Sequence, residues 1–79
     1  MHVIINVVIK MNKELSKLIE LRKNKGYSVK KMADLLNISK KFYWQIEKGQ
    51  RNLSYSMATK ISMVLNMKPD KIFYEDFSN

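Results

Sequence analysis

The chain has 79 residues, no cysteine, one histidine and a formal net charge of +8. This length holds a single domain, and the absence of cysteine excludes a disulfide framework and a thiolate metal site. The acidic residues show no paired arrangement and His2 cannot form a metal site alone, so we expect no enzyme activity, no metal and no cofactor. The lack of cysteine favours a cytoplasmic protein.

The N-terminal residues 2–10 predict a β-strand. β-Branched side chains recur there at every second position, which is typical of a strand with one apolar face. The apolar run is too short to span a bilayer and has no charged n-region or small-residue cleavage site, so we expect no membrane association. The apolar face consists of Val3, Ile5, Val7 and Ile9.

The rest of the chain offers this strand no obvious partner except the tail at 72–77. A lone strand leaves its backbone groups unpaired. We therefore expect residues 1–10 to be a dimerisation arm that pairs with the same strand of a second copy, and we include Ile72 and Phe73 in the interface. The alternative is that translation starts at Met11 and the leader is incidental.

Residues 11–79 carry the end signals of five helices and are expected to form one helical domain. Four of these helices begin after a residue whose side chain can cap an N-terminus, and proline suits the first turn of the fifth. Glycine or asparagine, which tolerate the left-handed conformation, follow the first four. The expected caps are Asn12, Ser28, Ser39 and Ser54, the proline is Pro69, and the stops are Gly26, Asn37, Gly49 and Asn66.

The second and third of these helices, at about residues 28–48, predict a helix-turn-helix. Ala33 is small enough for a close helix crossing, and Asn37 supplies the left-handed turn residue. Ile38, Tyr43 and Ile46 would form the buried side, with Phe42 also counted as core. The opposite face of the third helix would then carry Lys40, Lys41, Trp44, Gln45 and Lys48.

Almost all of the excess charge lies around this motif. Residues 22–51 contain nine basic and two acidic side chains, a net charge of +7. A basic stripe confined to one segment indicates a polyanionic partner, although a lysine-rich solvated surface is the alternative.

Residues 15–73 resemble the Cro-type, lambda-repressor-like helix-turn-helix family. The resemblance rests on the order and spacing of segments 21–26, 32–36, 38–39 and 46–52, continued by Ser54, Ile61, Leu65, Asp70 and Phe73. It implies a mainly α, five-helix DNA-binding domain, here with an additional N-terminal strand. It also implies a cytoplasmic, usually dimeric regulator of transcription, most often a repressor, in bacteria or phage.

The resemblance assigns roles to individual positions. The base-reading positions of the recognition helix, about 39–48, are Lys40, Lys41 and Gln45, to which we add Trp44 for contact with a sugar or a thymine methyl group. Lysine suits guanine and glutamine can bind adenine through both amide atoms. The residues expected to bind phosphate are Ser28, Lys30, Lys48, Gln50, Arg51 and Asn52, and Arg22 and Glu47 are expected to form a structural ion pair.

The sequence departs from the family pattern at four positions. Val29 stands where a glutamine often binds phosphate, and Trp44 where a small residue is common. Asn37 replaces a glycine and Leu53 a proline. Val29 removes one expected phosphate contact, and Trp44 changes the fit to the groove.

These observations predict a homodimeric regulator that binds double-stranded DNA sequence-specifically. One alternative is the DNA-binding antitoxin of a toxin–antitoxin pair, which would have an obligatory protein partner. Another is a protein-interaction module that has kept the fold, which the charge of residues 22–51 disfavours.

Overall fold

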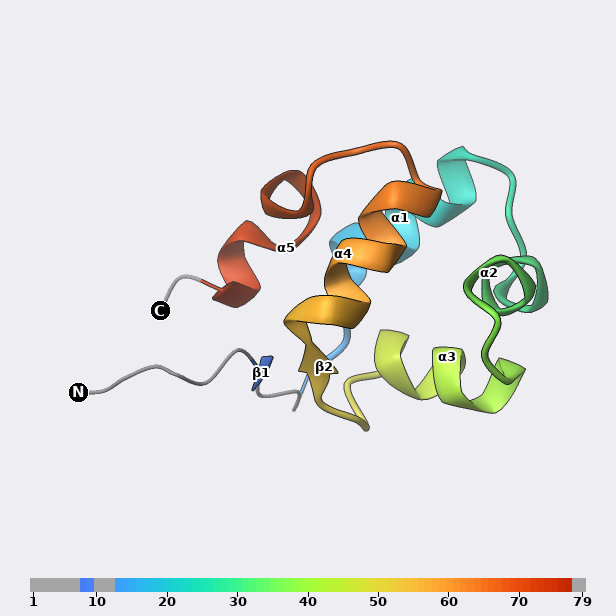
Figure 1. Cartoon of the computed structure of the whole chain (residues 1–79), viewed down its shortest axis with the longest axis horizontal. Helices are drawn as coiled ribbons and strands as arrows, with labels where there is room; N and C mark the ends of the chain where they lie inside the picture. Colours follow the sequence, from blue (N-terminus) through green and yellow to red (C-terminus); the bar gives the residue numbers. More distant parts are fainter. Residues whose placement is uncertain (1–7, 10–12, 78–79) are drawn as a thin grey trace.

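A computed structural model describes residues 8–9 and 13–77 of the chain. This part contains five helices and two short strands, which confirms the mainly α fold (Figure 1). In chain order the elements are β1 (Val8–Ile9), α1 (Ser16–Asn24), α2 (Val29–Leu36), α3 (Lys40–Glu47), β2 (Leu53–Ser54), α4 (Tyr55–Val64) and α5 (Pro69–Phe77).

Three serines cap helices as their positions in the sequence predict. Each hydroxyl oxygen accepts a hydrogen bond from the backbone N–H three residues later, at 2.9 Å for Ser28 and 3.0 Å for Ser39 and Ser54. Each bond satisfies a donor that the first helical turn leaves without a partner. The four expected stops all have positive φ: Gly26 (79°), Asn37 (60°), Gly49 (74°) and Asn66 (57°).

The start of α1 differs from the expectation. The predicted cap, Asn12, lies outside the described residues, and the helix begins only at Ser16, with Leu15 in the cap position and no side-chain cap. The backbone N–H of Leu15 instead donates to the carbonyl oxygen of Glu47 at 2.9 Å. A tertiary hydrogen bond from the end of α3 thus satisfies a group at the start of α1.

The core lies between all five helices and is built from one apolar side of each. Helix α4 contacts α2, α5 and β2, while α1 contacts α3 and α5. The fully buried aliphatic and aromatic side chains at its centre are Leu18, Met32, Tyr43, Ile46, Leu53, Ala58, Ile61, Leu65 and Phe73.

The placement of Ile72 and Phe73 in a dimer interface is wrong. Both lie on α5, where Ile72 is 4% and Phe73 0% exposed, because they pack into the core of their own chain. A side chain already buried in one chain has no surface left to offer a second copy.

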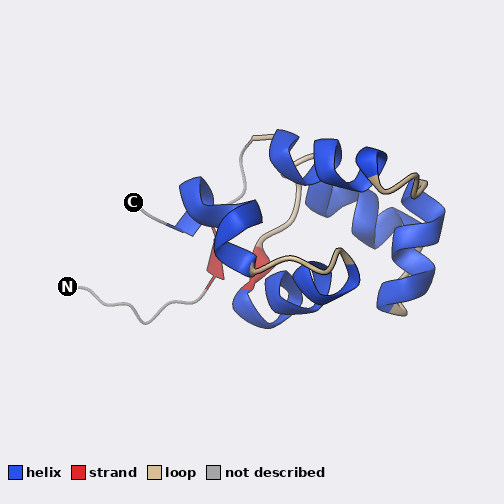
Figure 2. Ribbon diagram, turned by 90° about the horizontal axis from the view of Figure 1, so that it is seen from above, coloured by secondary structure: helices blue, strands red, loops and turns tan. Residues whose placement is uncertain are grey.

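The predicted N-terminal strand pairs with a segment whose sequence shows no strand pattern. Of residues 2–10 only Val8 and Ile9 belong to the described part, and they pair antiparallel with Ser54 and Leu53 of the same chain. Figure 2 shows the two strands side by side in red. The tail at 72–77, offered as a partner strand, is helical as far as Phe77. Val3, Ile5 and Val7 lie outside the described residues, so pairing between subunits stays a prediction.

Candidate nucleic-acid interface

Helix α3 divides into a buried side and an outer face. Tyr43, Ile46 and Glu47 are at most 1% exposed and point into the protein. The outer face carries the exposed side chains of Lys40, Lys41, Trp44 and Lys48 together with the half-buried Gln45. Helices α2 and α3 lie together at one end of the molecule, away from α5 (Figure 1). The outer face of α3 therefore belongs to the surface at that end.

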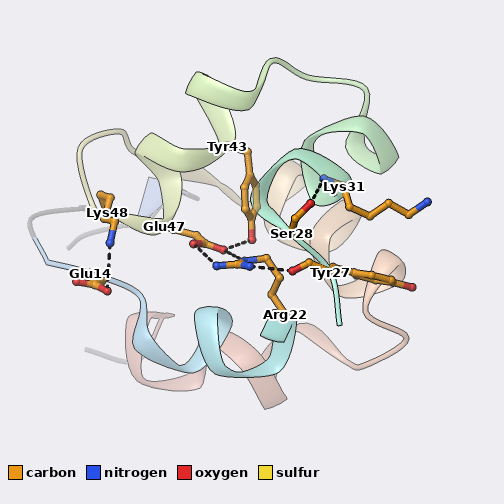
Figure 3. Close-up of polar contacts among 8 residues, drawn as sticks. All are labelled: Glu14, Arg22, Tyr27, Ser28, Lys31, Tyr43, Glu47 and Lys48. Carbon is orange, nitrogen blue, oxygen red and sulfur yellow. Dashed lines mark hydrogen bonds and ion pairs between the residues drawn. The ribbon is translucent and has the colours of Figure 1, made fainter. Parts of the chain in front are cut away.

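A buried polar cluster fixes α3 against α1. Glu47 accepts hydrogen bonds from Arg22 Nε at 2.5 Å, from Arg22 Nη2 at 3.2 Å and from the Tyr43 hydroxyl at 2.6 Å (Figure 3). Arg22 Nη1 also donates to the carbonyl oxygen of Tyr27 at 2.8 Å. The expected ion pair between Arg22 and Glu47 is thus present. It is buried and joins α1 to α3, which is a structural role.

The protonation states of this cluster follow from its contacts. The hydrogen bond to Glu47 raises the pKa of Arg22, although burial opposes it. Burial, followed by the hydrogen bond to Glu47, raises the pKa of Tyr43. Both groups therefore keep their protons in the folded state. The helical spacing of Tyr43 predicts only a buried core residue, and the signal for its hydroxyl contact was its position four residues before Glu47.

Gly49 forms the turn that ends α3. A Cβ atom at this position would lie 2.1 Å from the carbonyl oxygen of Lys13, because the chain entering α1 crosses directly over it. The backbone N–H of Gln50 then donates to the carbonyl oxygen of Gln45 at 2.9 Å. The turn leaves Gln50, Arg51 and Asn52 exposed directly after α3.

The positive charge of residues 22–51 is carried at the surface. Arg22 and Glu47 cancel each other inside the protein, which leaves eight exposed basic side chains against Asp34, again a net charge of +7. Two of these lysines have exposed ion-pair partners, Lys30 with Asp34 at 3.1 Å and Lys48 with Glu14 at 3.6 Å. Exposed pairs of this kind are weak, so both lysines can exchange their partners for phosphates.

Arg51 makes two contacts with α3 that the sequence did not suggest. Its Nε donates to Oε1 of Gln45 at 3.2 Å, and its guanidinium carbon lies 4.3 Å from the centroid of the Phe42 ring. Phe42 is half-buried, packs against the core with one side and supports Arg51 with the other. Of the other expected phosphate ligands, Ser28 and Lys30 are exposed at the start of α2.

Neither a metal site nor a membrane span is evident in the part of the chain that the structure describes. No group of three or more histidine, cysteine or acidic side chains in it could hold a metal ion. None of its helices is both long and apolar enough to cross a bilayer.

Comparison with known proteins places the fold among DNA-binding regulators. Residues 18–72 match the helix-turn-helix family designated HTH_3. A similar solved structure is the restriction-modification controller protein C.AhdI from Aeromonas hydrophila, which is 33% identical, with 73% of this chain and 88% of that one covered and a TM-score of 0.70. The biofilm master regulator SinR, solved in complex with DNA, is 29% identical over 73% of this chain and 94% of that one, with a TM-score of 0.66.

A third solved relative is longer. An HTH_3 family transcriptional regulator from Vibrio cholerae is 31% identical over 78% of this chain but only 35% of its own, with a TM-score of 0.68. A comparison with proteins of curated function returns no match.

Proposed function

The chain belongs to the helix-turn-helix family HTH_3, and from this membership we propose that it is a homodimeric transcription regulator that binds double-stranded DNA sequence-specifically. The observation that carries the proposal is the outer face of α3, which presents lysine donors and the indole ring of Trp44. On the opposite side of the helix, the bond between Glu47 and Arg22 holds α3 in place. A rigidly mounted helix is the element that this kind of motif inserts into the major groove.

In this proposal α3 is the recognition helix. Lys40, Lys41, Trp44 and Gln45 contact bases, which give specificity. The contacts to phosphate fix the protein on the duplex and supply most of the affinity. They come from the exposed groups on both sides of α3, namely Ser28, Lys30, Lys48, Gln50, Arg51 and Asn52.

Two such helices, one from each subunit, would enter successive major grooves about 34 Å apart. Bound across a promoter, the dimer would act as a repressor. The dimerisation arm is residues 1–10, whose apolar positions Val3, Ile5 and Val7 precede β1. Removing residues 1–7 leaves the pairing of β1 with β2 available, so this deletion tests the arm without removing the described sheet. Light scattering should show a monomer at micromolar concentration, whereas an unchanged dimer would exclude the arm as the interface.

DNA binding is tested by titrating duplex DNA at several salt concentrations. Each neutralised phosphate contributes about −0.9 to the slope of log K against log salt, so a dimer with at least about five phosphate contacts should give a slope of roughly −4 or steeper. A slope near zero with duplex DNA would contradict the proposal.

A pair of double variants shows whether the charge acts through α3. Lys40→Ala/Lys41→Ala removes two positive charges from the outer face, and we expect a large loss of affinity. Lys68→Ala/Lys71→Ala removes the same charge from exposed positions in or next to α5, at the far end of the molecule (Figure 1). Equal losses in both variants would mean that net charge, and not the face of α3, governs binding.

A further inference from the structure

The side chain of Arg51 is held against α3 by two different groups. Its Nε–H donates to Gln45 and its guanidinium carbon lies over the ring of Phe42. Phe42 and Gln45 are three residues apart on α3 and are therefore neighbours on its surface. The positive φ of Gly49 turns the chain after α3, which lets Arg51 reach both. The three side chains form a unit in the protein alone.

The hydrogen bond determines which way the amide of Gln45 faces. A guanidinium group has only donors, so only the carbonyl oxygen of Gln45 can face Arg51. The NH2 group is then the end of the amide that remains for other partners. The orientation thus follows from the chemistry of Arg51.

This orientation favours one base over another. In the major groove adenine presents an acceptor and an amino donor, whereas guanine presents two adjacent acceptors, N7 and O6. Adenine would need both the oxygen and the nitrogen of Gln45, but Arg51 occupies one lone pair of that oxygen and places a positive charge beside it. The adenine amino group, itself a donor, would be repelled there. The free NH2 group of Gln45 matches guanine.

We infer that Arg51 is a positioning residue for specificity: it presents the donor end of Gln45 to the groove, so that the pair selects guanine where an isolated glutamine would select adenine. The inference rests on the proposed function. It differs from the roles expected from the sequence, in which Gln45 reads adenine and Arg51 binds phosphate alone. The Nη atoms of Arg51 can still bind phosphate, which would couple a backbone contact to a base contact.

The test is selection of binding sites from randomised duplexes, followed by titration of two duplexes that differ only at the position lost in Gln45→Ala. The wild-type protein should prefer guanine there. Arg51→Ala should shift the guanine-to-adenine ratio of affinities toward adenine by about tenfold, the order of one bidentate contact. In the Gln45→Ala background Arg51→Ala should leave the ratio unchanged, since the group it positions is gone. Lys48→Ala, an exposed charge on the same face, should weaken both duplexes equally.

The outcomes separate the two proposals. If Arg51→Ala weakens both duplexes equally and keeps the ratio, Arg51 is only a phosphate ligand, and the inference fails while DNA binding stands. A wild-type protein that selects no motif would refute the proposed function and the inference with it. Should Arg51→Ala lose its circular dichroism signal, Arg51→Met takes its place, because it keeps an unbranched side chain beside Phe42 but has no donor for Gln45. It should shift the ratio in the same direction.

Discussion

Replacing Glu47 by alanine should remove a large part of the stability of this protein. Glu47 is 1% exposed and accepts three hydrogen bonds, two of them from the buried Arg22. The substitution leaves that guanidinium buried without a counter-charge, which costs about 3–5 kcal/mol. A domain of 79 residues has a total stability of roughly 4–12 kcal/mol. We therefore expect Glu47→Ala to lose between about a quarter and all of this stability.

Urea denaturation followed by circular dichroism measures the effect. With a slope of about 1 kcal/mol per M, typical of a small chain, the midpoint should fall by roughly 3–5 M. The matched control is Asp34→Ala, which breaks the exposed ion pair with Lys30. That pair is worth at most about 0.5 kcal/mol, so the midpoint should move by less than about 0.5 M.

A second variant separates two effects on the free energy of unfolding: the cost of leaving Arg22 without Glu47, and the net contribution of the intact ion pair. Arg22→Met/Tyr43→Phe/Glu47→Leu replaces the whole cluster with apolar groups of similar size, and such replacements are often neutral. It should recover most of the stability that Glu47→Ala loses. If Glu47→Ala lowers the midpoint no more than Asp34→Ala, or if the triple variant is the least stable of all, the reasoning about the buried charge is refuted.

Three further predictions concern single positions. Gly49→Ala should lower the melting temperature by more than twice as much as Gly26→Ala. Both positions need a positive φ, but only at Gly49 would the new Cβ lie 2.1 Å from the carbonyl oxygen of Lys13. Similar losses in the two variants would show that the chain at Lys13 can move away from Gly49. Since burial raises the pKa of Tyr43 above its usual value of about 10, the folded state keeps a proton that the unfolded state releases, and stability should fall as the pH rises above about 10. Tyr43→Phe should flatten this alkaline decline in urea midpoints, and an unchanged decline would assign it to other groups. Trp44 is 40% exposed on α3, so its emission should shift to the blue when the selected duplex binds; unchanged emission at saturation would place it outside the contact.

The sequence was most informative where structure depends on neighbouring residues. Ser28, Ser39 and Ser54 act as caps through bonds only three residues long, and a left-handed asparagine such as Asn37 needs no distant partner. The periodicity of α3 likewise separated its buried side from its outer face. These features could be predicted because each arises from the geometry of a single turn.

The errors and omissions all involve contacts that the geometry of a single helical turn does not determine. Leu15 replaces Asn12 as the cap because its partner is the backbone of Glu47, which no local pattern reveals. The partner of β1 is only two residues long, so Leu53–Ser54 carries no strand signal of its own. The hydrogen bond from Arg51 to Gln45 depends on the path of the chain after α3. The sequence predicts a turn there, but it does not predict which way the chain leaves the turn.

The division of α3 into two faces has a consequence for how the target specificity of such a protein can evolve. The side chains that hold the helix in place, Tyr43, Ile46 and Glu47, are not those that face outward. In the proposed interface, most substitutions at Lys40, Lys41 or Trp44 would therefore alter the preferred target at little cost to folding. New specificities can then arise by a few surface mutations, each leaving a folded and soluble intermediate. Gln45 is the exception, because its contact with Arg51 ties it to a second position, and the two would be expected to change together.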